Sequence, residues 1–292
     1  MNQLAAAACI ASAALLTRVQ PTPPPVPASP PSGYTLAWSD EFNNTGAPDP
    51  NNWTFENGFV RNQELQWYQP QNARVENGLL VIEARRERHL NLAYEPLDSA
   101  RGRPDPTDWR RSRQFAEYTS ASVMTRGLRS WQYGYFEMRG RIDTSAGLWP
   151  AWWTLGTTGR WPYNGEIDIM EYYRSTLLAN VAWGGPSPGR PIWDDVRKPI
   201  ASFGDPDWAR KFHVWRMLWD ERSIRLSVDD IWMNDVDVER TVNQDGGGAN
   251  PLRQTHYMLA NLAVGGTSGG DPSSTAFPVR YEIDYIRVYQ KQ

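Results

Sequence analysis

The sequence predicts an all-β domain in which two antiparallel sheets pack face to face as a jelly-roll sandwich. Two observations carry this prediction. From residue 34 onward, short runs rich in aromatic and β-branched residues alternate with Gly, Asn, Asp and Pro, which is the pattern of strands joined by turns. The sequence has no long amphipathic helix pattern and no regular alternation of strands with helices, and many strands without helices favour a two-sheet sandwich.

The predicted strands follow one another over most of the chain. Asn77-Gly78 between two such runs is a strong signal for a tight hairpin, and WDERSIRL at 219–226 predicts another. Residues 205–212 predict one short helix, with Asp205 as its cap. In order, the strand-like runs are YTLAWSDEF (34–42), ARVENGLLVIEARRE (73–87), SASVMTRG (120–127), YGYFEMRGRID (133–143), GEIDIMEYY (165–173), LLANVAWG (177–184), FHVWRMLWD (212–220), SIRLSVDD (223–230), YMLANLAVGG (257–266) and YEIDYIRVYQ (281–290).

The N-terminal region differs from the rest. Residues 4–16 form a short apolar run, so residues 1–19 are interpreted as an export signal, or as a lipoprotein leader if Cys9 carries a lipid. Residues 20–33 are rich in proline and predict a stiff linker, which leaves 34–292 as the folded domain. We therefore expect a secreted, periplasmic or cell-surface protein without a transmembrane span.

Composition narrows the possible ligands. Aromatic residues make up 12% of the 292 residues, and 15 are Trp, so some are expected to grip a ligand such as a sugar, although a Trp-rich core is the alternative. The net charge of −3 gives no sign of a nucleic-acid partner, and we expect a monomer. Cys9 is the single cysteine, and the three histidines are far apart, so neither thiol chemistry nor a transition-metal site is indicated.

The segment GEIDIMEY at 165–172 carries three acids. Alternate side chains of a strand share a face, so Glu166 and Asp168 point the same way, whereas strict alternation would bury Glu171 on the apolar side. An unpaired buried carboxylate is costly, and one extra residue near Ile169–Met170 avoids that cost. We therefore predict a β-bulge there, with all three acids on one polar face.

Three acids on one face suit the cleavage of glycosidic bonds. The backbones of Glu166 and Glu171 would lie about four strand steps, roughly 13 Å, apart. Side chains that lean together bring the carboxyl groups to about 5–6 Å, near the spacing of about 5–5.5 Å that a retaining mechanism needs. Like charges at this range drive the two pKa values apart. An acidic solvent-facing strand and a carboxylate metal site are the alternatives.

The EIDIME hexapeptide resembles the signature of glycoside hydrolase family 16, which contains laminarinases, lichenases and agarases. Further blocks in family order extend the resemblance over about residues 34–290, and it implies a concanavalin A-like jelly roll with a cleft on its concave sheet. These blocks are WSDEFN (38–43), NARVENGLLVIEARRE (72–87), YGYFEMRGRI (133–142), GLWPAWWTLG (147–156), ANLAVGG (260–266) and YEIDYIRVYQ (281–290).

The resemblance also implies roles for individual residues. Glu166 would be the nucleophile, Glu171 the general acid and then base, and Asp168 would orient Glu166. Trp149 and Trp153 would stack on sugars on the non-reducing side of the cut, while Trp152 would point into the core.

Other residues match family positions for which a structural role is the alternative to a binding role. Asn43 and Arg85 would bind sugar by hydrogen bonds, with structural roles as the alternative. Glu41, Gly78 and Asp284 match a calcium site, with a surface charge pair as the alternative. No cofactor is implied for the chemistry.

Two features depart from the family pattern and leave the substrate open. Trp183 stands where many laminarinases have His, and the arginine-rich segment 88–116 predicts a long loop; both would line the acceptor side of the cleft. The expected activity is endo-hydrolysis of β-1,3- or mixed β-1,3/1,4-glucan. The alternatives are a galactan hydrolase (agar, porphyran or β-galactan), favoured if the loop arginines face the cleft, and a non-catalytic carbohydrate-binding protein.

Overall fold

The computed structural model describes residues 26–96 and 108–292. The predicted export signal, Cys9 and the first part of the predicted linker lie outside the described residues. Within these two stretches, no helix has the length and apolar character that crossing a membrane would require.

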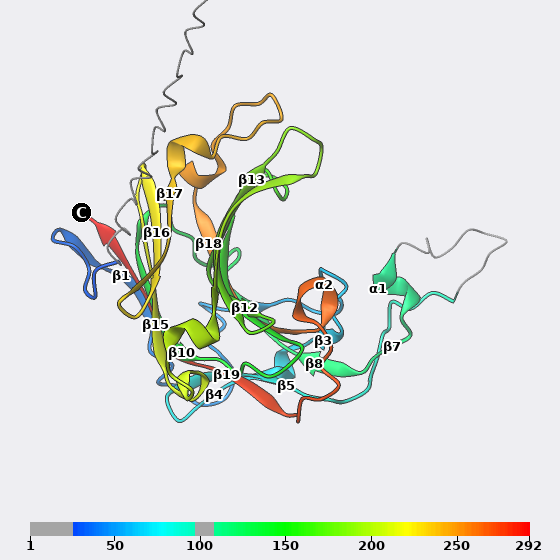
Figure 1. Ribbon diagram of the computed structural model, residues 1–292. Coiled ribbons are helices and arrows are strands. Elements are labelled where there is room, and N and C mark those ends of the chain that lie inside the picture. The colour runs from blue at the N-terminus through cyan, green and yellow to red at the C-terminus, as the bar shows by residue number, and fades with distance from the viewer. Residues whose placement is uncertain (1–25, 97–107) are drawn as a thin grey trace, which may run out of the picture.

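Two antiparallel sheets form the body of the molecule (Figure 1). The first sheet has eight strands, and β1 joins it by pairing with β19. Its other strands run in the order β17 (Ile231–Asp237), β16 (Ser223–Val228), β15 (His213–Trp219), β10 (Gly134–Arg141), β19 (Val279–Lys291), β5 (Leu79–Ala84) and β4 (Ala73–Glu76), with β1 at Tyr34–Asp40. The second sheet has seven strands in the order β14 (Pro191–Pro199), β13 (Thr176–Gly184), β12 (Glu166–Tyr173), β11 (Leu148–Gly156), β18 (His256–Val264), β9 (Ser122–Met124) and β2 (Thr54–Phe55).

Several short elements lie outside the two large sheets. The predicted helix at 205–212 is only a 3₁₀ turn, and the helices α1 and α2 have one turn each. These elements are the parallel pair β3 (Gln66–Tyr68) and β8 (Tyr118–Ser120), the antiparallel pair β6 (His89–Leu90) and β7 (Phe115–Ala116), α1 (Trp109–Ser112), α2 (Gly266–Gly269), and the 3₁₀ turns Pro70–Asn72, Ile200–Phe203, Trp208–Arg210, Val238–Arg240 and Pro251–Arg253.

Both predicted hairpins are present. Asn77 and Gly78 join β4 to β5 with φ angles of 54° and 75°, the left-handed conformation that an Asn-Gly turn provides. Between β15 and β16, the Asp220 carboxylate accepts hydrogen bonds from the backbone N–H groups of Arg222 and Ser223. The chain therefore reverses where the sequence indicates.

The core lies between the two sheets and is rich in tryptophan. Trp152, Trp215 and Trp219 are among its largest fully buried side chains. Trp152 points into this core, as predicted, because its neighbours on β11 alternate between core and outer face. Full burial of such side chains removes much apolar surface from water and is the main stabilising contribution.

The last residues of the predicted linker pack against the domain. Val26 is 2% exposed and contacts Tyr135 and Leu218. These two residues alternate with core residues on β10 and β15, so they lie on the outer face of the eight-stranded sheet. The Tyr135 hydroxyl also donates to the carbonyl of Pro27, at 2.9 Å. The packed region therefore begins before Tyr34, the predicted boundary.

Candidate active site

A cavity of about 600 Å³ opens on the outer face of the seven-stranded sheet. Trp149 and Trp153 from β11, Glu166 and Asp168 from β12 and Asn180 from β13 belong to its wall. Each of these side chains alternates with neighbours that point into the core, so the pocket is built from the outward half of the sheet.

The predicted β-bulge lies in β12, where Asp168 pairs with Trp153 and Met170 pairs with Trp152, so Ile169 is the extra residue. On the other side, the register with β13 shifts between Asp168 and Glu171. Ile169 and Met170 are both buried in the core, and Glu171 returns to the pocket face. The cost of burying Glu171 thus correctly predicts the bulge.

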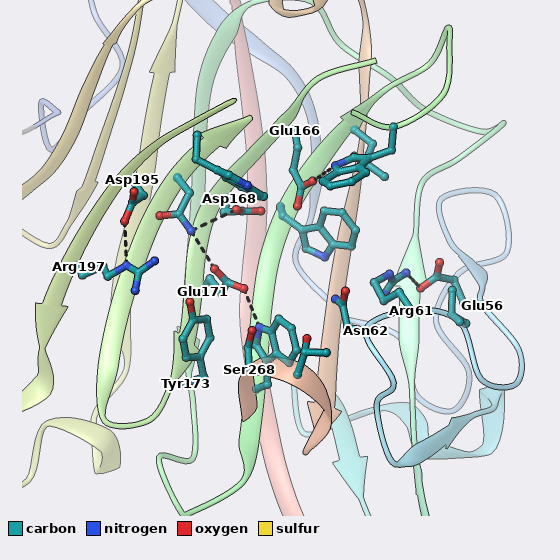
Figure 2. Close-up of a pocket in the computed structure, with 18 residues that line it drawn as sticks. Glu56, Arg61, Asn62, Glu166, Asp168, Glu171, Tyr173, Asp195, Arg197 and Ser268 are labelled. Carbon is teal, nitrogen blue, oxygen red and sulfur yellow. Dashed lines mark hydrogen bonds and ion pairs between the residues drawn. The ribbon is translucent and has the colours of Figure 1, made fainter. Parts of the chain in front are cut away.

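Hydrogen bonds fix the three acids in the pocket (Figure 2). The indole N–H of Trp149 donates to Glu171 at 2.7 Å, and that of Trp161 donates to Glu166. The Asn180 amide donates to Glu171 at 2.9 Å and to Asp168 at 3.4 Å. Each carboxyl group therefore has a defined orientation before any ligand binds.

Burial and mutual repulsion shift the acids to unequal pKa values. Burial raises the pKa of Glu171 to about 7, with the Trp149 hydrogen bond acting against it. Burial, followed by the charges of Glu166 and Glu171, raises the pKa of Asp168 well above its usual range. Burial also raises the pKa of Glu166, while hydrogen bonds from Trp161 and Asp168 lower it. Protonated Asp168 is thus suited to donate a hydrogen bond to Glu166. Glu171 is suited to gain and lose a proton near neutral pH.

Trp149 and Trp153 share the pocket face, as their spacing predicts. They are 8% and 7% exposed, so only part of each ring is free. The Trp153 indole N–H donates to the side-chain oxygen of Asn261 at 2.7 Å. The two rings are thus held rigidly against the sheet.

Three residues predicted to bind sugar lie outside this pocket. Asn43 follows β1, which belongs to the eight-stranded sheet, and it lines a separate cavity with Asp40 and Asp49. Trp183 shares its face of β13 with Val181 and packs in the core, because it is three residues from the pocket-facing Asn180. Asn43 therefore lies at the other sheet, and strand alternation turns Trp183 away from the pocket.

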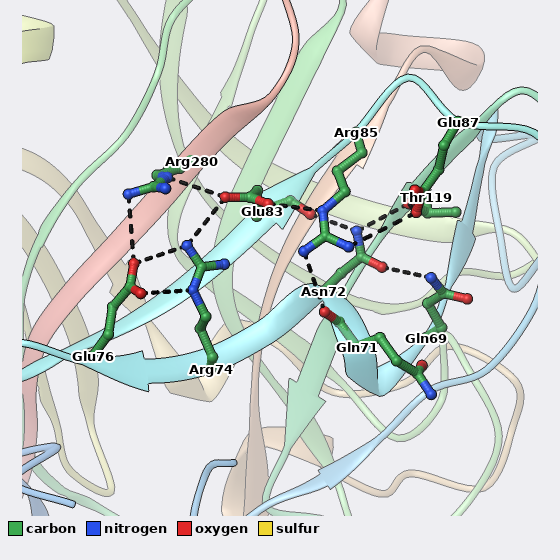
Figure 3. Close-up of polar contacts among 10 residues, drawn as sticks. All are labelled: Gln69, Gln71, Asn72, Arg74, Glu76, Glu83, Arg85, Glu87, Thr119 and Arg280. Atoms are coloured by element: carbon green, nitrogen blue, oxygen red, sulfur yellow. Dashed lines mark hydrogen bonds and ion pairs between the residues drawn. The ribbon is translucent and has the colours of Figure 1, made fainter. Parts of the chain in front are cut away.

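Arg85 also has a structural environment (Figure 3). Its Nε donates to Glu83 at 2.7 Å, and its Nη2 donates to the carbonyl of Gln71. Glu83 is bound by Arg74 and Arg280 as well. Arg85 follows β5 of the eight-stranded sheet and takes part in this ion-pair network instead of lining the pocket.

The two carboxylates predicted to bind calcium are paired with arginines in the structure. Both oxygens of Glu41 accept from Arg287, at 2.8 and 2.7 Å, and Asp284 is paired with Arg139. Gly78 lies in the tight β4–β5 turn. In the part of the chain that the structure describes, no three His, Cys, Asp or Glu side chains are grouped as metal ligands. Both carboxylates therefore belong to charge pairs with arginines in this structure, and the calcium site stays a prediction.

Two exposed tryptophans that were not predicted from the sequence lie at the pocket. Trp161 and Trp193 are 45% and 41% exposed, and their ring centres are 6.5 Å apart. Trp161 lies in a turn that has no periodic signal, and Trp193 lies on the edge strand β14, whose charged residues conceal the strand pattern. Strand alternation in 177–184 would have identified Asn180.

The described arginines of the 88–116 loop do not face the pocket. Arg110 and Arg113 donate to backbone carbonyls of the segment 60–64, and Arg111 pairs with Glu95 at 2.6 Å. Arg101 and Arg103 lie outside the described residues. Arg110, Arg111 and Arg113 therefore give no support to a galactan as the substrate.

The jelly-roll sandwich carries a rigid pocket on the outer face of one sheet, and this pocket holds three carboxyl groups of unequal acidity. This combination of fold and site defines a glycosidase. The model of the glycosyl hydrolases family 16 matches residues 62–287. The chain belongs to this family and hydrolyses O-glycosyl bonds.

Individual relatives agree with the family. The chain is 36% identical over 282 residues to a β-glucanase of Rhodothermus marinus, covering 88% of this chain and 85% of that protein. It resembles the catalytic domain of an endo-1,3-β-glucanase (laminarinase) from Thermotoga petrophila, with a TM-score of 0.71, 34% identity and coverage of 89% and 98% of the two chains. It also resembles a structure from work on endo-acting O-glycanases of the human gut microbiota that initiate mucin breakdown, with a TM-score of 0.78, 33% identity and coverage of 91% and 94%.

Proposed function

We propose that this chain is a retaining endo-β-glucanase that cleaves β-1,3- or mixed β-1,3/1,4-glucan, with Glu166 as nucleophile and Glu171 as acid and base. The observation that carries the mechanism is the bulged strand β12, which brings three carboxyl groups of different acidity onto one pocket face. The names of the Rhodothermus marinus and Thermotoga petrophila proteins support the substrate class.

The two steps follow from the acidities. In the first, protonated Glu171 gives its proton to the leaving oxygen while Glu166 attacks the anomeric carbon, and the glycosidic bond breaks as the glycosyl–Glu166 ester forms. In the second, Glu171, now ionised, removes a proton from water, which attacks the same carbon and releases Glu166. Two inversions give net retention.

Asp168 and the tryptophans have supporting roles. The hydrogen bond between Asp168 and Glu166 keeps the proton on Asp168 and the charge on Glu166. Trp161 donates to Glu166 and fixes its direction of attack. Trp161 and Trp193 offer exposed rings on which sugar units stack beside the nucleophile.

The first experiment measures new reducing ends from laminarin, barley mixed-linkage glucan, xyloglucan, agarose, porphyran, carrageenan and mucin O-glycans. Wild type is compared with Glu166→Gln and with Glu239→Gln, an exposed glutamate outside the pocket. We expect release from laminarin or barley glucan, lost by several orders of magnitude in Glu166→Gln only. Activity on a galactan alone would reject the glucan proposal and keep the mechanism, whereas tight binding without release would indicate a binding protein.

Azide distinguishes the nucleophile from the acid. In Glu166→Ala, azide replaces the missing carboxylate and attacks directly, so the glycosyl azide has inverted configuration. In Glu171→Ala with an activated aryl glycoside, azide attacks the glycosyl–enzyme ester, and the product has retained configuration. The opposite pattern in the anomeric NMR signals would exchange the two roles.

The relative from work on mucin O-glycanases supports a second candidate. Its TM-score of 0.78 exceeds that of the laminarinase, at similar sequence identity. A mucin O-glycan is therefore the alternative substrate. Mucin O-glycans in the panel separate it from β-glucan.

We also propose that the protein acts outside the cytoplasm. The apolar run at 4–16 and the proline-rich residues after it support export. Cell fractionation of the full chain and of Cys9→Ser tests this. Release of the Cys9→Ser variant alone from the membrane fraction would support a lipid anchor.

A further inference from the structure

An arginine covers one of the two tryptophans expected to stack on sugar. The Cζ atom of Arg61 lies 5.0 Å from the centre of the Trp153 ring and 5.9 Å from that of Tyr68. These distances are within the range of cation–π contact. With Trp153 only 7% exposed, little of its ring is left for a sugar.

An ion pair keeps Arg61 on this ring (Figure 2). Its Nη2 group is paired with Glu56, whose Oε2 also accepts from the Ser122 hydroxyl at 2.7 Å. The side chains of Arg61 and Glu56 are 21% and 14% exposed. Burial lowers the pKa of Arg61, but the negative charges of Glu56 and Glu64 raise it by more. The pKa is therefore above its usual value, and the guanidinium stays charged.

The backbone that carries Arg61 is also held in place. Arg110 donates to the carbonyl of Val60 at 3.0 and 2.6 Å, and Arg113 donates to the carbonyl of Glu64 at 2.8 Å. These contacts come from the long loop 88–116. Arg61 therefore has little freedom to leave Trp153 when a ligand enters.

One donor group of Arg61 is unused. Its Nη1 group is buried and has no hydrogen-bond partner among the residues at 26–96 and 108–292. A buried donor without a partner destabilises the protein. Nη1 itself is closed to solvent, but the Arg61 side chain is 21% exposed and lines the pocket, so a bound sugar can reach the part of the guanidinium group that faces the pocket.

We propose that Arg61 is a specificity-determining residue, which recognises one sugar unit by a hydrogen bond from its guanidinium group to a sugar oxygen in place of stacking on Trp153. This inference rests on the proposed function, because it takes the ligand to be a β-linked polysaccharide. The subsite at Trp153 would then select for the position of a hydroxyl oxygen, a property that a bare aromatic ring lacks.

The test compares kcat/KM over laminarin oligosaccharides of increasing length for wild type, Arg61→Ala and Arg61→Lys. Arg222→Ala is the control, because the Arg222 side chain is 84% exposed. We expect Arg61→Ala to lose about ten- to a hundredfold, mainly through KM, on oligosaccharides long enough to reach Arg61, and nothing on shorter ones. Arg61→Lys retains a charged donor and should recover part of the loss.

A second variant and the melting temperature guard against a structural explanation. Trp153→Phe keeps a ring beneath Arg61 and is expected to change kcat/KM less than Arg61→Ala does. An equal loss at every length, an unchanged kcat/KM, or a gain in Arg61→Ala would overturn the proposal. If wild type turns over no glucan, the β-glucan proposal fails and the proposal for Arg61 fails with it. If wild type is active but the ratio of its kcat/KM to that of Arg61→Ala is the same at every oligosaccharide length, only the role of Arg61 is rejected.

Discussion

At the scale of single residues, burial and the Trp149 indole together determine the pKa of Glu171. Burial raises the pKa of Glu171 to about 7, and the N–H that Trp149 donates to the carboxylate keeps this pKa from rising further. Glu171 must be protonated to serve as the acid, so the rate falls as pH rises through this pKa. The alkaline limit of activity therefore depends on Trp149.

Trp149→Phe removes this donor and should move the alkaline limb of kcat/KM to higher pH by about one unit. The measurement is the pH–rate profile, in which the position of the limb is read separately from any fall in rate. Trp153→Phe is the matched control, because its N–H is bound to Asn261 and not to a carboxylate. A limb that stays in place in Trp149→Phe would contradict this origin of the acidity.

The same glutamate makes stability depend on pH. Its pKa in the folded state, about 7, is above the usual value of 4.5, so folding favours the protonated form. This contribution is complete below about pH 4.5 and is lost as pH rises past 7. Glu171→Gln cannot ionise, so its melting temperature relative to wild type should increase between pH 5 and pH 8. Exposed Glu239→Gln should show no such trend, and an equal trend in both would remove Glu171 as the cause.

At the scale of elements, the bulge in β12 is matched to its neighbour. Glu166 pairs with Leu155 and Glu171 with Ala151, so six residues of β12 lie opposite five of β11. The two consecutive core-facing residues, Ile169 and Met170, take up the difference. Removing one of them would restore regular alternation and leave Glu171 on the pocket face.

Deletion of Met170 should therefore keep hydrolysis within about tenfold of wild type, since the spacing across β11 is unchanged. Loss of a fully buried side chain should still cost about 2–5 kcal/mol of stability. Deletion of both Ile169 and Met170 shifts Glu171 to the core face and should abolish activity. Activity assays and thermal unfolding of both variants check this, and equal inactivation by both deletions would contradict it.

Features on regular strands could be predicted from the sequence, whereas the contacts of loop residues could not. The strand alternation and the cost of burying Glu171 were sufficient to predict the sheets, the bulge and the acid face. The same alternation, applied to β13, would have placed Trp183 in the core. Arg61 could not be placed on Trp153, because the loop that carries it has no periodicity and is shaped by contacts from the distant 88–116 loop.

At the scale of the whole molecule, residues before Tyr34 complete the domain. A chain that begins at residue 34 exposes Tyr135 and Leu218, which Val26 covers. Burial of Val26 alone is worth about 1.5–3 kcal/mol. The variant that begins at residue 34 should have a melting temperature several degrees below that of a variant that begins at residue 26. The two should have equal kcat, because the pocket is on the other sheet. Equal melting temperatures would show that the segment contributes nothing.

The pairing of β1 with β19 brings the two ends of the domain together. Tyr34 lies opposite Lys291, and the N–H of Gln292 donates to the carbonyl of Gly33. Both ends thus belong to the sheet that faces away from the pocket. A solid support or a fused partner attached at either end would lie on the side of the molecule opposite the pocket, and a polymer much larger than the protein could still reach the pocket. Immobilisation through the termini should therefore leave access to insoluble substrate intact.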